Sequence, residues 1–164
     1  MAGGSPRHSY LGTRAILQLG RSVRDGRCDV HGSDLRLEID ATHFAYADAV
    51  VVCRPLTLRP GTTDVVTNPA LVVEVLSRST EAYDRGDKQG SYLALPSVEH
   101  FLLVSQREPR VELYTREADG SFRYTVHGAG ARIDLGRHGA IEVDELYAGA
   151  WELAGDDPLV EPRP

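Results

Sequence analysis

"PALVVEVLSRST", residues 69–80, predicts a strand buried on both faces of a sheet. Five of the six residues from Ala70 to Val75 are apolar and three of them are valines, which is typical of a central strand. Glu74 is the exception within this run. An ionised carboxylate in such surroundings costs several kcal/mol unless it is paired, hydrogen-bonded or bound to a metal. The stretch therefore predicts both a central strand and a partner for Glu74.

A second buried strand is predicted at residues 49–53, which are valine-rich and end shortly before Pro55. Asp48 stands at the beginning of this strand. If the two strands are neighbours, Asp48 and Glu74 project at the same end of the sheet. Two carboxylates, together with water and substrate phosphate, are the ligands that Mg²⁺ commonly receives. The alternative, in which Glu74 lies at an exposed strand end or pairs with an arginine, stays open at this point.

Lys88 is a second candidate partner, because an ammonium group beside a metal-bound water can position the nucleophile or stabilise charge on a phosphate. It is the only lysine in the sequence. Asp84 and Lys88 are also four residues apart on a predicted helix at 79–95. Without further evidence, such a pair is expected to be a solvent-exposed ion pair that contributes a few tenths of a kcal/mol to helix stability.

The remaining pattern is helix, strands, helix, strands, which indicates an α/β or α+β fold with a mixed sheet. Residues 10–23 have apolar side chains at helical spacing, and His8, at the start of this helix, could reach a site on the central strands. Residues 27–40 predict a strand or a hairpin around Gly32. Three further strands are predicted at 99–106, 110–117 and 121–128, with a turn between the last two.

Length and composition indicate a soluble globular protein, with residues 1–154 as a single domain and 155–164 as a flexible C-terminal tail. The net charge of −6 means that any nucleic-acid role requires a local basic patch. Cys28 and Cys53 are far apart and form no CxxC pair, so we expect reduced thiols in a cytoplasmic protein. No segment is apolar enough to span a membrane.

Four segments together resemble the Uma2 family of endonucleases in order and approximate spacing. They are SPRH with the helix that follows, YADAVVV, PALVVEVLSRST, and YDRGDKQGSYLALPSVEHFLLV. The resemblance spans about residues 8–114, and the block at 69–104 is its most specific part. The family is assigned the PD-(D/E)XK nuclease fold. The resemblance therefore implies a restriction-endonuclease-like mixed central sheet flanked by helices, with additional C-terminal strands.

The same resemblance implies an enzyme, a DNA endonuclease that hydrolyses phosphodiester bonds with Mg²⁺ or Mn²⁺. Asp48, Glu74 and the carbonyl of Val75 would hold the metal, and Lys88 would join the two acids as a catalytic residue. In the wider superfamily a lysine usually lies two residues after the second acid, where this chain has Leu76. The Uma2 pattern places the lysine on the following helix, as here. DNA is the implied partner, and a homodimer is expected because nucleases of this fold often use two copies to reach two strands.

One departure from the family pattern gives a second hypothesis. Family members usually carry a glutamate ahead of the SPxH element, whereas this sequence starts at Met1 just before it. A missing acidic ligand would weaken metal binding, so the chain could be a catalytically impaired member that binds DNA or protein. A third hypothesis is an unrelated β-rich binding domain. It predicts that Asp48 and Glu74 lie more than about 10 Å apart, too far for one metal with ligand distances of about 2 Å.

Overall fold

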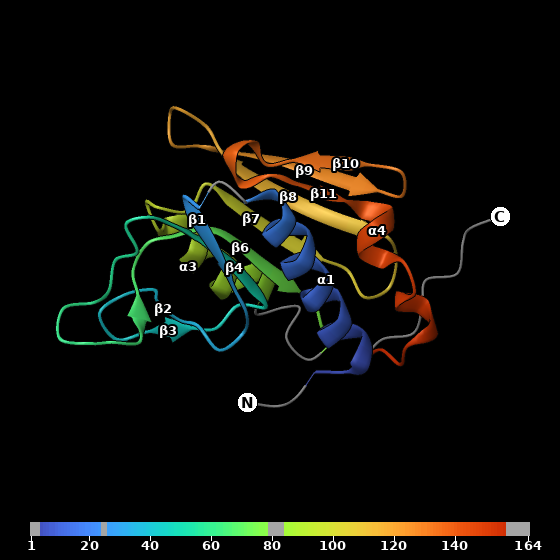
Figure 1. Ribbon diagram of the computed structural model, residues 1–164, viewed down its shortest axis with the longest axis horizontal. Helices are drawn as coiled ribbons and strands as arrows, with labels where there is room; N and C mark the ends of the chain where they lie inside the picture. Colours follow the sequence, from blue (N-terminus) through green and yellow to red (C-terminus); the bar gives the residue numbers. More distant parts are fainter. Residues whose placement is uncertain (1–3, 24–25, 79–83, 157–164) are drawn as a thin grey trace.

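A six-stranded mixed sheet forms the centre of the computed structural model, which describes residues 4–23, 26–78 and 84–156 (Figure 1). Its strand order is β1-β4-β6-β7-β8-β9, and only the β6–β7 pair is parallel. The strands are β1 (Cys28–His31), β4 (Ala49–Cys53), β6 (Pro69–Val75), β7 (His100–Val104), β8 (Arg110–Arg116) and β9 (Phe122–Gly128). The predicted mixed sheet and its additional C-terminal strands are confirmed.

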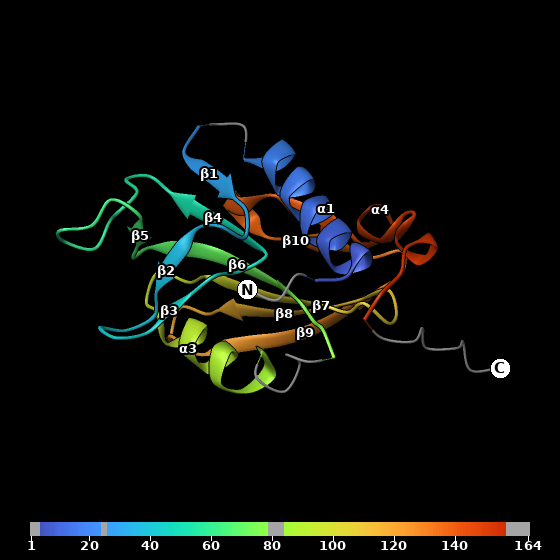
Figure 2. The same ribbon diagram turned by 90° about the horizontal axis from the view of Figure 1, so that it is seen from below.

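Helix α1 (Pro6–Ser22) covers one face of this sheet (Figure 2). Ser5 caps the helix by accepting a hydrogen bond from the backbone N–H of His8, and Pro6 occupies the first helical turn. The buried apolar stripe of α1 packs on alternate residues of β4 and β6. The same layer contains α4 (Val143–Tyr147), β10 (Arg132–Asp134), β11 (Ala140–Glu142) and the 3₁₀ turns η2 (Gly136–His138) and η3 (Ala150–Glu152).

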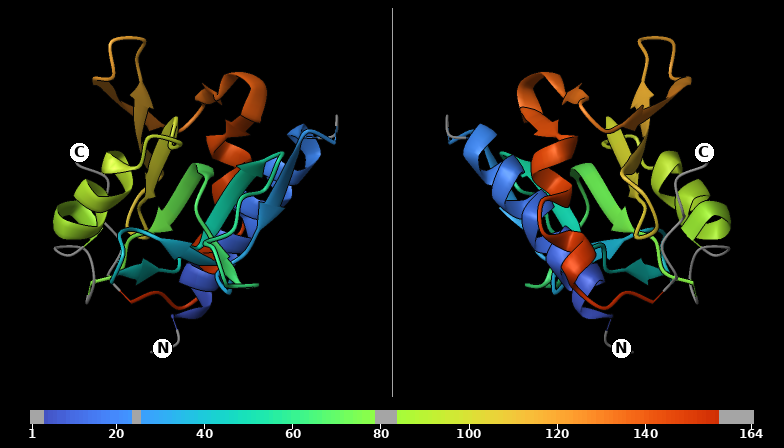
Figure 3. Two further views of the ribbon diagram at one scale, coloured as in Figure 1. Left: turned by 90° about the vertical axis from the view of Figure 1, so that its left-hand side faces the viewer. Right: turned by 90° about the vertical axis from the view of Figure 1, so that its right-hand side faces the viewer.

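The opposite face carries α3 (Gln89–Ala94), which continues directly from a π-helix, η1 (Asp84–Lys88). Figure 3 shows this lime-coloured segment and the blue α1 on opposite sides of the sheet. In addition to the central sheet, there is a three-stranded sheet of order β3-β2-β5. Its strands are β2 (Arg36–Glu38), β3 (Phe44–Ala45) and β5 (Val65–Val66). The hairpin considered around Gly32 is wrong, since β1 pairs with β4 and β2 belongs to the small sheet.

Strand β6 is buried along its whole length and supplies side chains to both apolar layers. Leu71, Val73 and Val75 join the core cluster under α1. Val72 and Leu76 join the second cluster, with residues of α3 and β7. Glu74 has the same strand parity as these two residues, so its carboxylate enters the α3 side of the sheet. The sequence prediction of a fully covered strand is confirmed.

Cys28 and Cys53 form a disulfide in the structure, so the expectation of separate reduced thiols is wrong. The two cysteines are direct neighbours across the antiparallel β1–β4 pair. A separation of 25 residues along the chain gave no indication of this cross-strand register.

The flexible C-terminal tail stays a prediction. Most of the predicted tail, residues 157–164, lies outside the described residues. Among the described helices, none is long and apolar enough to cross a membrane.

Candidate active site

Asp48 lies where β4 begins and β6 ends, because the two strands are antiparallel and Ala49 pairs with Val73. The backbone N–H of Asp48 donates to the carbonyl of Val73 at 3.1 Å. Its carboxylate Oδ2 accepts a hydrogen bond of 2.7 Å from the backbone N–H of Val75. The strands are therefore neighbours, as the sequence suggested, and Asp48 is fixed beside the residue that follows Glu74.

Glu74 contacts two groups from the helical segment that covers it. Its Oε1 lies 2.7 Å from Nζ of Lys88 and accepts a hydrogen bond of 3.0 Å from the hydroxyl of Tyr92. The side chain of Glu74 is only 4% exposed and that of Lys88 only 14%. The ammonium of Lys88 also donates to the carbonyl of Tyr46 at 3.3 Å. Lys88 is thus an inward-pointing residue whose side chain is largely shielded from solvent.

Tyr92 and Tyr46 are contacts that the sequence did not point to. The ring of Tyr92 is fully buried, and its hydroxyl touches the carboxylate of Glu74. Its spacing of four residues from Lys88 is the signal that could have indicated a shared helix face. Asp84, the predicted helical partner of Lys88, has a side chain outside the described part of the structure.

Leu76 shows why the lysine comes from the helix in this chain. It occupies the position two residues after Glu74, and its side chain is 5% exposed within the apolar cluster of the α3 side. An ammonium group there would be buried among hydrocarbon, which is costly without a paired charge. The helix instead brings Lys88 to the carboxylate from above the sheet.

His8 approaches the same end of the sheet from the first turn of α1. Its Nε2 lies 3.5 Å from Oδ2 of Asp48, and both side chains are 19% exposed. Gly12, one turn further along α1, lies close enough that a Cβ there would be 3.5 Å from the Cβ of Asp48. His8 and Asp48 both border an open pocket of about 610 Å³ between α1 and residues 32–34.

A second buried carboxylate lies on the same side of the sheet as Glu74. Glu74 is opposite Leu103 of β7, and Leu103 is opposite Glu112 of β8, so the three side chains form one row. Both oxygens of Glu112 accept hydrogen bonds from Arg85, at 2.7 and 2.9 Å. The π-helix η1 therefore directs Arg85 to one carboxylate and Lys88, three residues later, to the other.

The charge of Glu112 is further supported by Arg110 at 3.2 Å and by the hydroxyl of Tyr124 at 3.0 Å. Burial alone would raise the pKa of Glu112, but the hydrogen bonds and charge of Arg85, with the other donors, lower it below its ordinary value. Nothing in the sequence had distinguished Glu112 from an ordinary strand residue.

The donor set at the end of β4 and β6 is suited to a hard divalent cation. Asp48 and Glu74 supply carboxylate oxygens and Val75 a backbone carbonyl, which are the ligand types of Mg²⁺ rather than of softer metals. Asp48 borders the pocket, so an ion that contacts it would also meet solvent or substrate. The assignment of these residues as metal ligands, and of Lys88 and His8 to the site, stays a prediction.

Comparisons with known proteins agree with the resemblance seen in the sequence. Residues 1–145 match the model of the Uma2 family, described as "Putative restriction endonuclease". Two proteins from Synechocystis sp. are similar to this chain. "Uncharacterized protein slr1290" is 36% identical over 151 residues, with 91% of this chain and 78% of that protein covered. "Uncharacterized protein sll1609" is 31% identical over 137 residues, with 82% and 77% covered.

A solved structure shares the fold. It is a crystal structure of "a putative nuclease belonging to DUF820" from Anabaena variabilis, with a TM-score of 0.71 and 14% identity over 92% of this chain and 84% of that one. The predicted restriction-endonuclease-like fold is confirmed, and an unrelated β-rich domain is excluded. With the family model covering most of the sequence, the chain belongs to the Uma2 family.

Proposed function

We propose that this chain is a metal-dependent endonuclease that hydrolyses phosphodiester bonds in DNA, with Mg²⁺ or Mn²⁺ as the cofactor. The observation that carries the proposal is the convergence of Asp48, Glu74 and Lys88 at one end of the β4–β6 pair. Family membership supports the general class of nuclease.

Asp48, Glu74 and the carbonyl of Val75 would hold the ion. A bound divalent cation supplies a Lewis acid that lowers the pKa of water and neutralises phosphate charge. The protein's own contribution begins with position: the backbone N–H of Val75 fixes one oxygen of Asp48, and Tyr92 holds one oxygen of Glu74. Two carboxylates held in this way lose little freedom when they bind, which favours a defined geometry.

Lys88 would stabilise the negative charge that develops on the phosphate during cleavage. Its ammonium is held between the carboxylate of Glu74 and the carbonyl of Tyr46, with little exposure to solvent. Preorganised charge in a site shielded from water is worth more than the same charge in bulk solvent. The pocket beside Asp48 has a volume in the range of small-molecule sites, about 300–1,000 Å³, and could admit one sugar-phosphate unit.

His8 would act at the opening of this pocket. Its imidazole lies beside Asp48 and forms part of the pocket wall, where it could contact a phosphate oxygen or a water molecule. The first turn of α1 contains no acidic residue, so nothing on that turn opposes an anion in the pocket. We assign His8 an accessory role in substrate placement.

The test is cleavage of supercoiled plasmid DNA in Mg²⁺ and in Mn²⁺, with EDTA as the metal-free arm. Asp48→Asn, Glu74→Gln and Lys88→Met are each expected to reduce nicking by about 10²-fold or more, as for loss of a group that stabilises the transition state. Asp34→Asn is the matched control, because Asp34 is an exposed carboxylate that borders the same pocket. It should cleave like the wild type.

Metal binding gives an independent measure. Mn²⁺ bound by the wild type should be detected by electron paramagnetic resonance, and Asp48→Asn and Glu74→Gln should weaken it while Asp34→Asn does not. Equal nicking by all variants, or no nicking by the wild type in either metal, would overturn the proposed activity. Retention of labelled duplex DNA without cleavage would instead support the impaired, DNA-binding member.

A further inference from the structure

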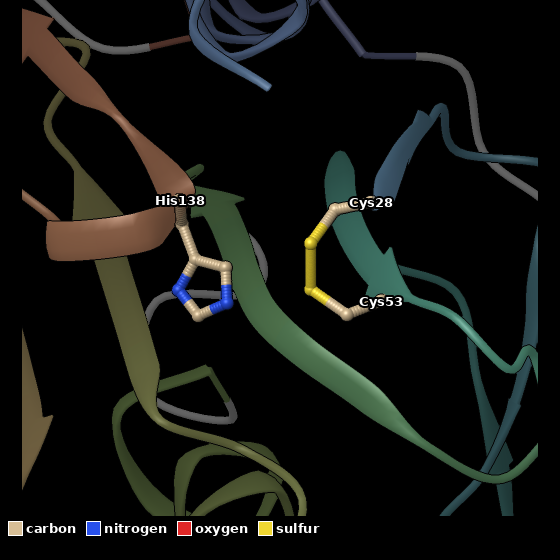
Figure 4. Close-up of side chains that lie close together, drawn as sticks. All are labelled: Cys28, Cys53 and His138. Atoms are coloured by element: carbon tan, nitrogen blue, oxygen red, sulfur yellow. A yellow bond between two sulfur atoms is a disulfide. The ribbon is translucent and has the colours of Figure 1, made fainter. Parts of the chain in front are cut away.

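A second cluster of metal-ligating side chains lies at the opposite end of β4 from Asp48. Cys28 and Cys53 face one another across the β1–β4 pair, and His138 of η2 approaches them from the α1 side (Figure 4). A ligand atom from each of the three side chains lies within 4.8 Å of the other two. The five residues of β4, at about 3.3 Å per residue, separate this cluster from Asp48 by roughly 17 Å.

The imidazole of His138 is buried without the hydrogen bonds that buried polar groups normally make. The residue is 0% exposed, and neither ring nitrogen has a hydrogen-bond partner in the described part of the chain. The nearest carboxylate oxygen, on Glu99, is 4.0 Å from Nε2, which is beyond hydrogen-bond length. Buried polar groups are normally hydrogen-bonded, so an imidazole without a hydrogen-bond partner among the described residues needs an explanation. Its position beside two cysteines is compatible with metal binding.

The three side chains match the chemistry of a thiophilic metal. Two cysteine sulfurs and one imidazole nitrogen are typical zinc ligands, and a site with three protein ligands leaves a fourth position for water. We propose that, once the disulfide is reduced, Cys28, Cys53 and His138 bind a thiophilic divalent cation of the Zn²⁺ type. The disulfide is then the closed, metal-free state of the same site.

The change between the two states balances chemically with a dithiol as the reductant. The dithiol gives two electrons and two protons, the bond between the sulfurs of Cys28 and Cys53 breaks, two thiols form, and the dithiol becomes a cyclic disulfide. When the cation binds, each thiol releases its proton to solvent and the sulfur donates its lone pair to the metal. In the reverse direction each sulfur regains a proton as the ion leaves, and the cyclic disulfide accepts two electrons and two protons while the bond between the two sulfurs forms again.

Both cysteines border a pocket that opens to solvent. A pocket of about 380 Å³ is bordered by both cysteines together with Gly26, Arg27, Arg54 and Arg137. Arg54 is paired with Asp29, and Arg137 with Glu99, so these two guanidinium charges are balanced before a cation approaches. Two thiolates would in turn neutralise the charge of a divalent ion. The pocket therefore gives both a reductant and a metal a route to the site.

The experiment uses the full chain, reduced with a dithiol, freed of the reductant without air, and titrated with Co²⁺. We expect a near-ultraviolet sulfur-to-cobalt charge-transfer band and the intense visible bands of a tetrahedral site, with intensities that correspond to one sulfur-bound Co²⁺ per chain. Added Zn²⁺ should remove both. The oxidised protein is the same-sequence control and should show neither band.

Variants separate this site from the candidate active site. Cys28→Ser should abolish the charge-transfer signature, and His138→Gln should weaken cobalt binding by more than the roughly 10- to 100-fold that follows loss of an outer-shell group. His43→Gln, at an exposed histidine, and Asp48→Asn should leave it unchanged. Absence of the band in the reduced wild type, or an unaltered band in folded His138→Gln, would overturn the proposal.

A second measurement covers the case in which a variant does not fold. Zn²⁺ should raise the melting temperature of the reduced wild type by more than that of the oxidised protein, because a ligand that binds only the native state stabilises it and the sulfur ligands are available only after reduction. An equal rise in both states would also overturn the proposal.

Discussion

Lys88 and Glu74 form an ion pair between a helix and the central strand of the sheet, with Nζ 2.7 Å from Oε1. Both side chains are largely shielded from water. A shielded pair has little net effect on stability relative to apolar residues, but the removal of one partner leaves an uncompensated charge. The pair therefore links the position of the helical segment formed by η1 and α3 to the charge of Glu74 in the sheet beneath it.

Lys88→Met is expected to lower the free energy of unfolding by about 3–5 kcal/mol, because Glu74 is left charged without its ammonium partner. Adding Glu74→Gln removes that charge, so the double variant should regain much of the loss. Urea unfolding of the wild type, the two single variants and the double variant gives the coupling energy. Additive single effects would show that the contact contributes little.

Tyr92→Phe removes the hydroxyl that holds Oε1 of Glu74 and keeps the buried ring. A hydrogen bond to a charged group is worth about 1.5–3 kcal/mol, so unfolding stability should fall by that order. If Tyr92 positions Glu74 in the proposed nuclease, the Mg²⁺ concentration needed for half-maximal cleavage should rise by about 10-fold or more. Tyr124→Phe is the matched control for the metal effect, since its hydroxyl contacts Glu112 instead. A changed stability with an unchanged Mg²⁺ dependence would limit Tyr92 to a structural role.

Glu112 predicts a specific loss of stability in acid. Burial would raise its pKa, yet Arg85 and the other donors lower it below the ordinary 4.5. A carboxyl whose folded pKa is lowered stabilises the native state above its unfolded pKa, and this contribution disappears as the pH falls through the folded value. The free energy of unfolding should thus decrease as the pH drops below about 4.5.

The measurement for Glu112 is the free energy of unfolding across pH 2–7, taken for the wild type and for Glu112→Gln. The variant should be less stable at neutral pH and should show a flatter acid slope. Parallel curves for the two proteins would contradict the lowered pKa of Glu112.

Gly139 is the glycine whose replacement should be most damaging. Its φ of +95° is unfavourable for other residues, and an added Cβ would lie 1.9 Å from the Cβ of Ser22, at the end of α1. Backbone strain and overpacking together predict a loss of about 2–5 kcal/mol for Gly139→Ala. Gly20→Ala is the control, because nothing lies within 4 Å of its added Cβ and it lies within α1. That substitution should stabilise the protein by about 0.5–1 kcal/mol in thermal unfolding. Similar values for both would refute the steric argument.

The main strands and α1 could be predicted from the sequence because each has a long, regular apolar pattern. Strand β6 and helix α1 are clear examples. The strands of the β3-β2-β5 sheet and of the two-stranded β10–β11 sheet are two or three residues long, which is too short for a period to be visible. The disulfide depended on the register of β1 against β4, which the spacing of Cys28 and Cys53 does not contain.

The candidate site was predictable in part. Physical reasoning required a partner for Glu74 and offered Asp48 and Lys88, and the structure places Lys88 in contact with it. The resemblance to Uma2, and not spacing alone, had singled out Lys88. Glu112 and Arg85 could not be recognised, because their pairing depends on which strands are neighbours and on the π-helical turn that directs Arg85 to Glu112.

The parallel pairing of β6 with β7 determines which part of the chain can supply a positively charged side chain to Glu74. Two neighbouring strands that run in the same direction require the chain to leave the end of the first and return over one face before the second begins. Residues 84–94 belong to this return path, which starts above the end of β6 that carries Glu74. The topology itself thus delivers a helical segment to the buried carboxylate, so that Lys88 can reach it without any lysine on the strand.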